Sequence, residues 1–158
     1  MNVLRDLSNK FGIKSLAMLL VLSWVPKMAA VAPAHQIDVV HAIRRVRVIS
    51  GPNEKTAAAE HLRDIVLTTR ASDIDNQTIR ALASLLSIRL GAVRYWVAEA
   101  LGHFGPRAQF VAPKLRRILA ESECVISETS SEDMIRDTLE RIGSPAPPKR
   151  CDSYIFPK

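Results

Sequence analysis

One helical pattern occurs three times in this sequence, and its period restricts the possible folds more than any other feature. The copies are AAEHLRDI at 58–65, VAEALGHF at 97–104 and IRDTLERI at 135–142. Their central leucines, Leu62, Leu101 and Leu139, are spaced 39 and then 38 residues apart. Apolar residues three and four positions apart form one stripe on a helix. Each copy therefore predicts an amphipathic helix with one buried face.

A second helical pattern precedes each of these copies. It occurs as AIRRV at 42–46, ALASL at 81–85 and KLRRI at 114–118, with apolar anchors Ile43, Leu82 and Leu115. In the first two units the anchors of the two helices lie 19 residues apart, whereas in the third unit they lie 24 residues apart. The sequence therefore predicts three two-helix units, the third with an insertion between its helices.

Units of this kind cannot bury their apolar faces alone, but they form a continuous core when they stack. The chain has breakers between units or helices: SGPN at 50–53, GPR at 105–107 and GSP at 143–145. Gly105 and Gly143 follow predicted helices, as C-terminal capping glycines do. We expect an all-α fold, a short α-solenoid of three two-helix repeats over residues 35–145, followed by a proline-rich tail at 146–158.

The segment VRYWVAEALGHFGPRAQFVAPKLRRIL resembles a HEAT repeat of the phycobilisome-lyase-like type. The residues that carry the resemblance are Val93, Arg94, Leu101, Gly102, Gly105 and Pro113. It is close over residues 78–120 and extends over most of 36–145. The outer units depart from the pattern, with Arg63 and Glu140 where the family has glycine, as terminal capping repeats do. The resemblance implies a binding scaffold, with lyase or nucleic-acid roles in a few members, and it brings no catalytic motif.

The first 34 residues have the layout of a secretory signal peptide. Arg5, Lys10 and Lys14 precede the apolar run SLAMLLVLSWV, and small residues follow it. This run of 11 residues is shorter than the roughly 20 that cross a bilayer. We expect cleavage between Ala34 and His35 and export to the periplasm or cell exterior, with an uncleaved anchor or a first buried helix as alternatives.

Removal of residues 1–34 would leave 18 basic and 15 acidic residues, a net charge of +3 rather than +6. A nucleic-acid-binding domain usually concentrates far more basic charge on one face. We therefore expect no nucleic-acid partner.

Motifs for catalysis, metal binding and cofactor binding are missing from the sequence. The four histidines, at His35, His41, His61 and His103, form neither an HExxH motif nor a pattern of two histidines and a carboxylate. A GxSxG nucleophile motif and a glycine-rich phosphate loop are also missing. We predict no catalytic residue, no metal and no cofactor.

The start of the middle unit has two interpretations. Asn76-Gln77-Thr78 has the form of an N-glycosylation sequon. Asp75 or Asn76 would also cap a helix that begins at Thr78, and we favour the cap.

The second helix of the middle unit carries the candidate protein-binding residues. Trp96 replaces a residue that is small in the HEAT pattern, and core packing is its expected role. Tyr95 lies next to it around the helix, so we expect it on the inner face of the stack with Arg94 and Glu99. Aromatic and arginine side chains are common interface anchors. Arg94 also matches a family position with a structural role between helices, so its role stays open.

Basic residues recur on the first helices of the outer units. They are Arg44, Arg45 and Arg47 in the first unit and Arg116 and Arg117 in the third. The middle unit has Ala83 and Ser84 at the equivalent positions, so the predicted basic ridge is interrupted. This ridge is either a solvated outer face or a surface that attracts an acidic partner or anionic lipid.

The two cysteines are Cys124, in the insertion of the third unit, and Cys151, in the tail. A disulfide between them would close a loop of about 28 residues and stabilise the fold by about 3 to 4 kcal/mol. The thiols can meet only if the tail returns along the last helix. Two free thiols are the alternative.

These features favour an exported, non-catalytic adaptor that binds another protein through the second helices of its repeats. A lyase-like enzyme or cofactor-attachment factor is one alternative, and a small inhibitor or immunity-type partner of a secreted enzyme is another. The oligomeric state stays open.

Overall fold

The computed structural model describes residues 34–122 and 131–149, which form helices and connecting segments without a β-strand. The six α-helices are α2 (Ala34–Val48), α3 (Pro52–Thr68), α4 (Asn76–Ser84), α5 (Gly91–Gly102), α6 (Ala112–Ser122) and α7 (Glu132–Arg141). The 3₁₀ segments between them are η1 (Ala71–Asp73), η2 (Leu85–Ser87) and η3 (Gly105–Val111). The predicted all-helical fold is confirmed for these residues.

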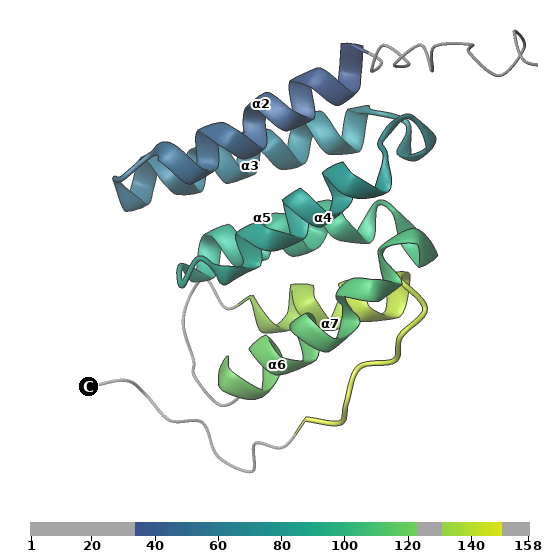
Figure 1. The fold of residues 1–158 in the computed structure, drawn as a ribbon. Helices are drawn as coiled ribbons and strands as arrows, with labels where there is room; N and C mark the ends of the chain where they lie inside the picture. Colours follow the sequence, from purple (N-terminus) through teal and green to yellow (C-terminus); the bar gives the residue numbers. More distant parts are fainter. Residues whose placement is uncertain (1–33, 123–130, 150–158) are drawn as a thin grey trace, which may run out of the picture. The chain divides into compact units, whose positions relative to one another are not determined.

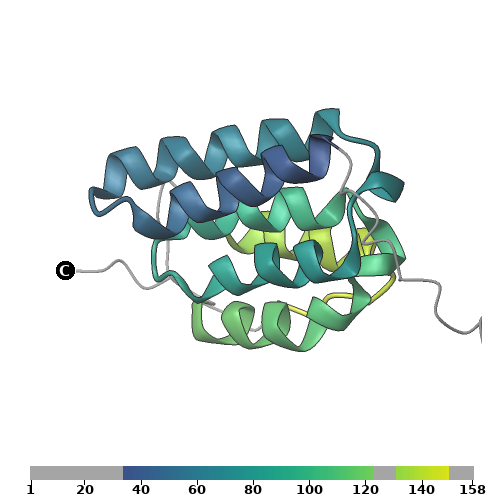
Figure 2. The ribbon, with the colours of Figure 1, turned by 45° about the horizontal axis from the view of Figure 1, so that its top comes forward.

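The helices pack together in consecutive pairs. α2 packs against α3, α4 against α5 and α6 against α7. α5 contacts both α3 and α7, and α2 contacts α4 (Figure 1). Figure 2 shows α2, α4 and α6 along one side of the bundle and α3, α5 and α7 along the other. We call these the first-helix layer and the second-helix layer.

Every predicted anchor residue lies in the core. Leu62, Leu101 and Leu139 on the second helices are 0% exposed. The anchors on the first helices, Ile43, Leu82 and Leu115, are also buried and belong to the same apolar cluster. Burial of one apolar stripe per helix is the main source of stability for helices this short. The helical phase predicted from the sequence is therefore confirmed.

Two predicted helix-end signals are also confirmed. The carboxylate of Asp75 accepts the Thr78 N–H at 2.6 Å, so Asp75 is the N-cap of α4, which begins at Asn76 and not at the expected Thr78. Gly105 and Gly143 have positive φ angles of 53° and 76°. A residue with a Cβ is strained there, which explains glycine at both positions. Beyond Gly143, the Ser144 N–H bonds back to the Leu139 carbonyl at 2.9 Å and closes the end of α7.

The chain after α7 turns back along that helix. Residues 144–149 have no regular secondary structure. Arg116 of α6 donates to the Ser144 hydroxyl and the Pro145 carbonyl. The contacts with side chains of α7 are Ala146 with Glu140, Pro147 with Arg136 and Lys149 with Asp133. Because the partner positions descend as the tail advances, this segment runs antiparallel to α7. Cys124 and Cys151 lie outside the described residues.

Candidate protein-binding surface

A half-buried cluster joins α3 and α5 on the second-helix layer. The Arg63 guanidinium carbon lies 4.5 Å from the centroid of the Trp96 ring. Nε of Arg63 is 3.5 Å from Oε2 of Glu99, and the Arg63 and Glu99 side chains are 20% and 21% exposed. Neither of these two atoms makes a hydrogen bond within the described residues. The cluster therefore combines a stacked cation, an indole ring and a carboxylate that can still accept a hydrogen bond.

The surroundings of this cluster are acidic. Arg63 also lies 3.8 Å from a Glu60 carboxylate oxygen and 3.2 Å from one of Asp64. Three carboxylates thus surround one guanidinium, and Glu60 and Asp64 are largely exposed. Exposed ion pairs of this kind contribute little to stability. The carboxylates of Glu60, Asp64 and Glu99 therefore outnumber the single Arg63 guanidinium that they contact.

Tyr95 extends the aromatic surface of α5. Its ring meets the Trp96 ring edge to face, with centroids 4.8 Å apart and an interplanar angle of 90°. Both side chains are partly exposed, and Trp96 also packs against the apolar core. The core packing predicted for Trp96 is therefore only part of its environment, because its ring also contacts Arg63.

The structure separates the three predicted binding residues. Glu99 joins the cluster with Arg63, and Tyr95 lies beside it. Arg94 is elsewhere: its Nε donates to the carbonyl oxygens of Leu86 and Ile88, at 3.2 and 3.0 Å. It thus ties α5 to η2 and the residue that follows it, a structural contact of the kind expected for Arg94 from the HEAT resemblance.

Arg63 was not predicted as a site residue, although the sequence marks its position as unusual. Arg63 directly follows Leu62, and the equivalent position after Leu101 is Gly102. It was therefore visible as a departure from the repeat pattern. Only the packing of α3 on α5 shows that this departure fills space beside Trp96.

The seam between α5 and α7 has a glycine and a buried threonine in place of an aromatic cluster. A Cβ added to Gly102 would lie 3.1 Å from Cδ of Arg141 and 3.7 Å from Oγ1 of Thr138. Thr138 is fully buried and donates its hydroxyl proton to the Ala98 carbonyl at 2.9 Å. The partly exposed aromatic cluster is therefore a feature of the α3–α5 seam.

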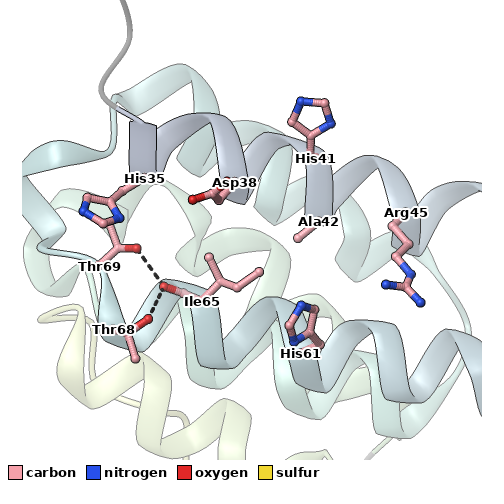
Figure 3. Close-up of a pocket in the computed structure, with 9 residues that line it drawn as sticks. All are labelled: His35, Asp38, His41, Ala42, Arg45, His61, Ile65, Thr68 and Thr69. Carbon is pink, nitrogen blue, oxygen red and sulfur yellow. Dashed lines mark hydrogen bonds between the residues drawn. The ribbon is translucent and has the colours of Figure 1, made fainter.

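Three of the four histidines line a groove between α2 and α3. The groove has a volume of about 380 Å³, and its lining includes His35, Asp38, His41, Arg45 and His61. Figure 3 shows Arg45 on α2 and His61 on α3 on the two sides of this groove. His103 has a different environment, with Nε2 2.9 Å from the Thr69 carbonyl oxygen. Within residues 34–122 and 131–149, no three His, Cys, Asp or Glu side chains are grouped to hold a metal ion.

The predicted cleavage site falls at the edge of the described structure. Ala34 and His35 are the first two residues of α2, and His35 is exposed. The preceding part of the predicted signal peptide lies outside the described residues. Among the helices that are described, none has the length and apolar content needed to cross a membrane.

Comparisons with protein-family models, with curated proteins and with solved structures found no match for this chain.

Proposed function

We propose that this chain is a non-catalytic HEAT-repeat adaptor that binds another protein through its second-helix layer. The observation that carries the proposal is the partly exposed cluster of Arg63, Trp96 and Glu99, which joins the second helices of two successive units. Tryptophan, tyrosine and arginine are the residues most enriched among binding hot spots. Tyr95 adds a second aromatic ring at the edge of the same cluster.

The pairwise packing of the helices supports the HEAT-repeat part of the proposal. Three consecutive helix pairs follow one another, and the second helix of the middle pair contacts the second helices of both neighbours. An α-solenoid has this arrangement of contacts, because each repeat touches only the repeats next to it. In such stacks the second helices form an extended surface that is available to a partner.

Affinity purification with matched variants tests the proposal. The tagged full chain would be expressed in its native cell, with Tyr95→Ala/Glu99→Ala as the test variant and Arg44→Ala/Arg117→Ala as the control. The control removes two exposed charges from the first-helix layer. We expect one or more proteins to be recovered with the wild type and the control, and at least about tenfold less with the test variant, because truncation of a hot-spot residue costs about 2 kcal/mol or more.

Recovery of the same proteins with the test variant would contradict the proposed surface. Thermal melts followed by circular dichroism would show whether both double variants keep the wild-type fold. Turnover of a small molecule by the purified chain would instead favour the lyase-like alternative. Inhibition of a co-purified secreted enzyme would favour the inhibitor alternative.

We also propose that the adaptor acts outside the cytosol, on the basis of the charged, apolar and small-residue regions at its N-terminus. N-terminal sequencing of the protein from a periplasmic or secreted fraction is expected to begin at His35. Recovery of the chain from the cytosol with Met1 still present would contradict export.

The path of the tail supports a disulfide between Cys124 and Cys151. Residues 144–149 run back along α7 toward the insertion, which is the direction that the pairing requires. An exported protein occupies an environment in which disulfides persist. Titration of the exported protein with a thiol reagent, denatured but not reduced, is expected to find no free thiol. Two reactive thiols per chain would rule out the bridge.

A further inference from the structure

The two helix layers carry opposite charge. The helices α2, α4 and α6 together contain seven basic and two acidic residues, whereas α3, α5 and α7 contain five basic and eight acidic residues. The net charges are therefore +5 and −3. Six of the seven basic side chains of the first-helix layer are exposed: Arg44, Arg45, Arg47, Arg80, Arg116 and Arg117. The net charge of the whole chain, +6, does not reveal this division.

The basic ridge continues across the middle unit, where the sequence predicted an interruption. Arg47 extends from α2 to α4, and its Nη2 donates to Oγ of Ser84 at 2.6 Å. Lys114 approaches from α6 on the other side, and its Nζ donates to the Ala83 carbonyl at 3.0 Å. The two neighbouring helices thus place cations at the positions where the middle unit has none of its own.

A groove lies in this part of the layer, between α4 and the segment formed by η3 and α6. Its volume is about 320 Å³, and it is lined by Arg80, Ala83, Ser84, Phe110, Val111 and Lys114. No carboxylate is among these lining residues. The Arg80 guanidinium carbon lies 4.4 Å from the centroid of the Phe110 ring, which is 39% exposed. The groove therefore combines two cations with the apolar side chains of Ala83, Phe110 and Val111.

Lys114 lies in an unbalanced positive environment. Partial burial lowers the pKa of its ammonium group, and repulsion from Arg117 and Arg94 lowers the pKa further. The partners of its hydrogen bonds in this structure are a carbonyl and the Ser87 hydroxyl, which are neutral. An anion in the groove would favour the charged form of Lys114 and relieve this repulsion.

We propose that this groove is a binding site for an acidic segment of a protein partner, with Glu or Asp carboxylates at Arg80 and Lys114 and an apolar side chain on Phe110. The site lies in the layer opposite the Arg63–Trp96 cluster, so it does not depend on the function proposed for that cluster. Attraction between the carboxylates of this segment and the cations of the groove would orient the segment and speed its association.

Two observations favour a protein segment over nucleic acid or lipid. The Arg80 side chain covers one face of the Phe110 ring, so this ring is not a free platform for stacking a base. Phe110 is also the one large apolar residue exposed in the described part of α4, η3 and α6, whereas insertion into a lipid surface needs a continuous apolar face.

Fluorescence anisotropy with the full chain tests the site. The probe is a fluorescein-labelled peptide of repeated Glu-Glu-Leu units, in buffer of about 50 mM salt so that exposed charges are not fully screened. The test variant is Arg80→Gln/Lys114→Gln. The control is Arg141→Gln/Lys149→Gln, which changes the net charge equally on α7 and the tail. We expect the test variant to weaken binding by about tenfold and the control by less than about twofold.

Because Lys114 also bonds to the end of α4, Arg80→Gln is measured alone as well. Its side chain is exposed and contacts the Phe110 ring, so we expect an unchanged melting temperature and about threefold weaker binding. Equal losses in the two double variants, or no binding of the peptide to the wild type, would overturn the proposal. In competition experiments, single-stranded DNA, phosphatidylserine vesicles and unlabelled peptide are compared at equal concentrations of negative charge. If the DNA or the vesicles displace the labelled peptide more effectively than the unlabelled peptide does, the site prefers phosphates and the proposal is overturned.

Discussion

Truncation of Leu101 tests the packing of the helices most directly. Leu101 is 0% exposed and lies on α5, the helix that contacts both α3 and α7. Leu101→Ala removes most of a buried side chain, and the loss has two parts. One is the lost transfer of apolar surface out of water, and the other is the cavity that remains.

The position of Leu101 in the middle of the second-helix layer determines the expected size of the loss. Substitutions of this kind cost about 2 to 5 kcal/mol, with larger values where the site cannot collapse. α5 has a packed helix on either side within its layer, so its neighbours cannot close the cavity easily. We expect about 4 kcal/mol for Leu101→Ala and about 3 kcal/mol for Leu139→Ala, because α7 contacts α5 alone within the layer.

Urea denaturation of the full chain, followed by far-UV circular dichroism, measures both losses. Leu67→Ala is the matched control, because Leu67 lies on α3 but is 36% exposed. We expect this control to cost less than about 1 kcal/mol. A loss for Leu101→Ala that is no larger than that of the control would refute the burial of Leu101 and the packing order derived from it.

Three further predictions concern single contacts. The Thr78 N–H holds the pKa of the Asp75 carboxyl below its ordinary value. Asp75 therefore stabilises the fold above about pH 4, and this stabilisation is lost as the pH falls. In thermal melts, Asp75→Ala should cost about 1 kcal/mol at pH 7 and less at pH 3. Arg94→Lys should cost about 1 kcal/mol in urea denaturation, because lysine lacks the Nε donor to the two carbonyls. Gly102→Ala should change stability by less than about 1 kcal/mol because the flexible Arg141 side chain can move, whereas Gly102→Val should cost about 1 to 3 kcal/mol by crowding α7.

The sequence predicted the helices and their buried faces because both depend on local pattern. Leu62 and Leu139 are buried for the same reason as Leu101, namely their place on the apolar stripe of a helix. Helix ends were predicted less well. The pattern at 81–85 indicated α-helix through Leu85, but the chain tightens into 3₁₀ geometry there. Arg94 of α5 donates to the carbonyls of Leu86 and Ile88, at the end of this 3₁₀ segment. The local sequence pattern at 81–85 carries no information about that contact.

The same limit applies to the basic ridge. Aligned positions showed cations in the outer units and Ala83 and Ser84 between them, so an interruption was the direct interpretation. Arginine and lysine side chains, however, are long enough to extend to the next helix. Arg47 and Lys114 do so from opposite sides. Repeat alignment places a charge at its Cα, whereas the ridge depends on where the charged end of each side chain lies.

One repeat position explains why the candidate binding cluster lies at one seam and not the other. The residues that directly follow Leu62, Leu101 and Leu139 are Arg63, Gly102 and Glu140. Glycine at the middle position lets α7 approach α5 closely, so this seam is held by small contacts such as that of Thr138 with the Ala98 carbonyl. Arginine at the first position spans the α3–α5 seam and stacks on an indole ring that remains partly exposed. Glutamate at the third position lies on the last helix of the described residues and accepts the Ala146 N–H of the returning tail at 3.0 Å. The two departures from glycine in the outer units therefore have separate causes: one builds the candidate surface, and the other holds the chain that covers the last helix.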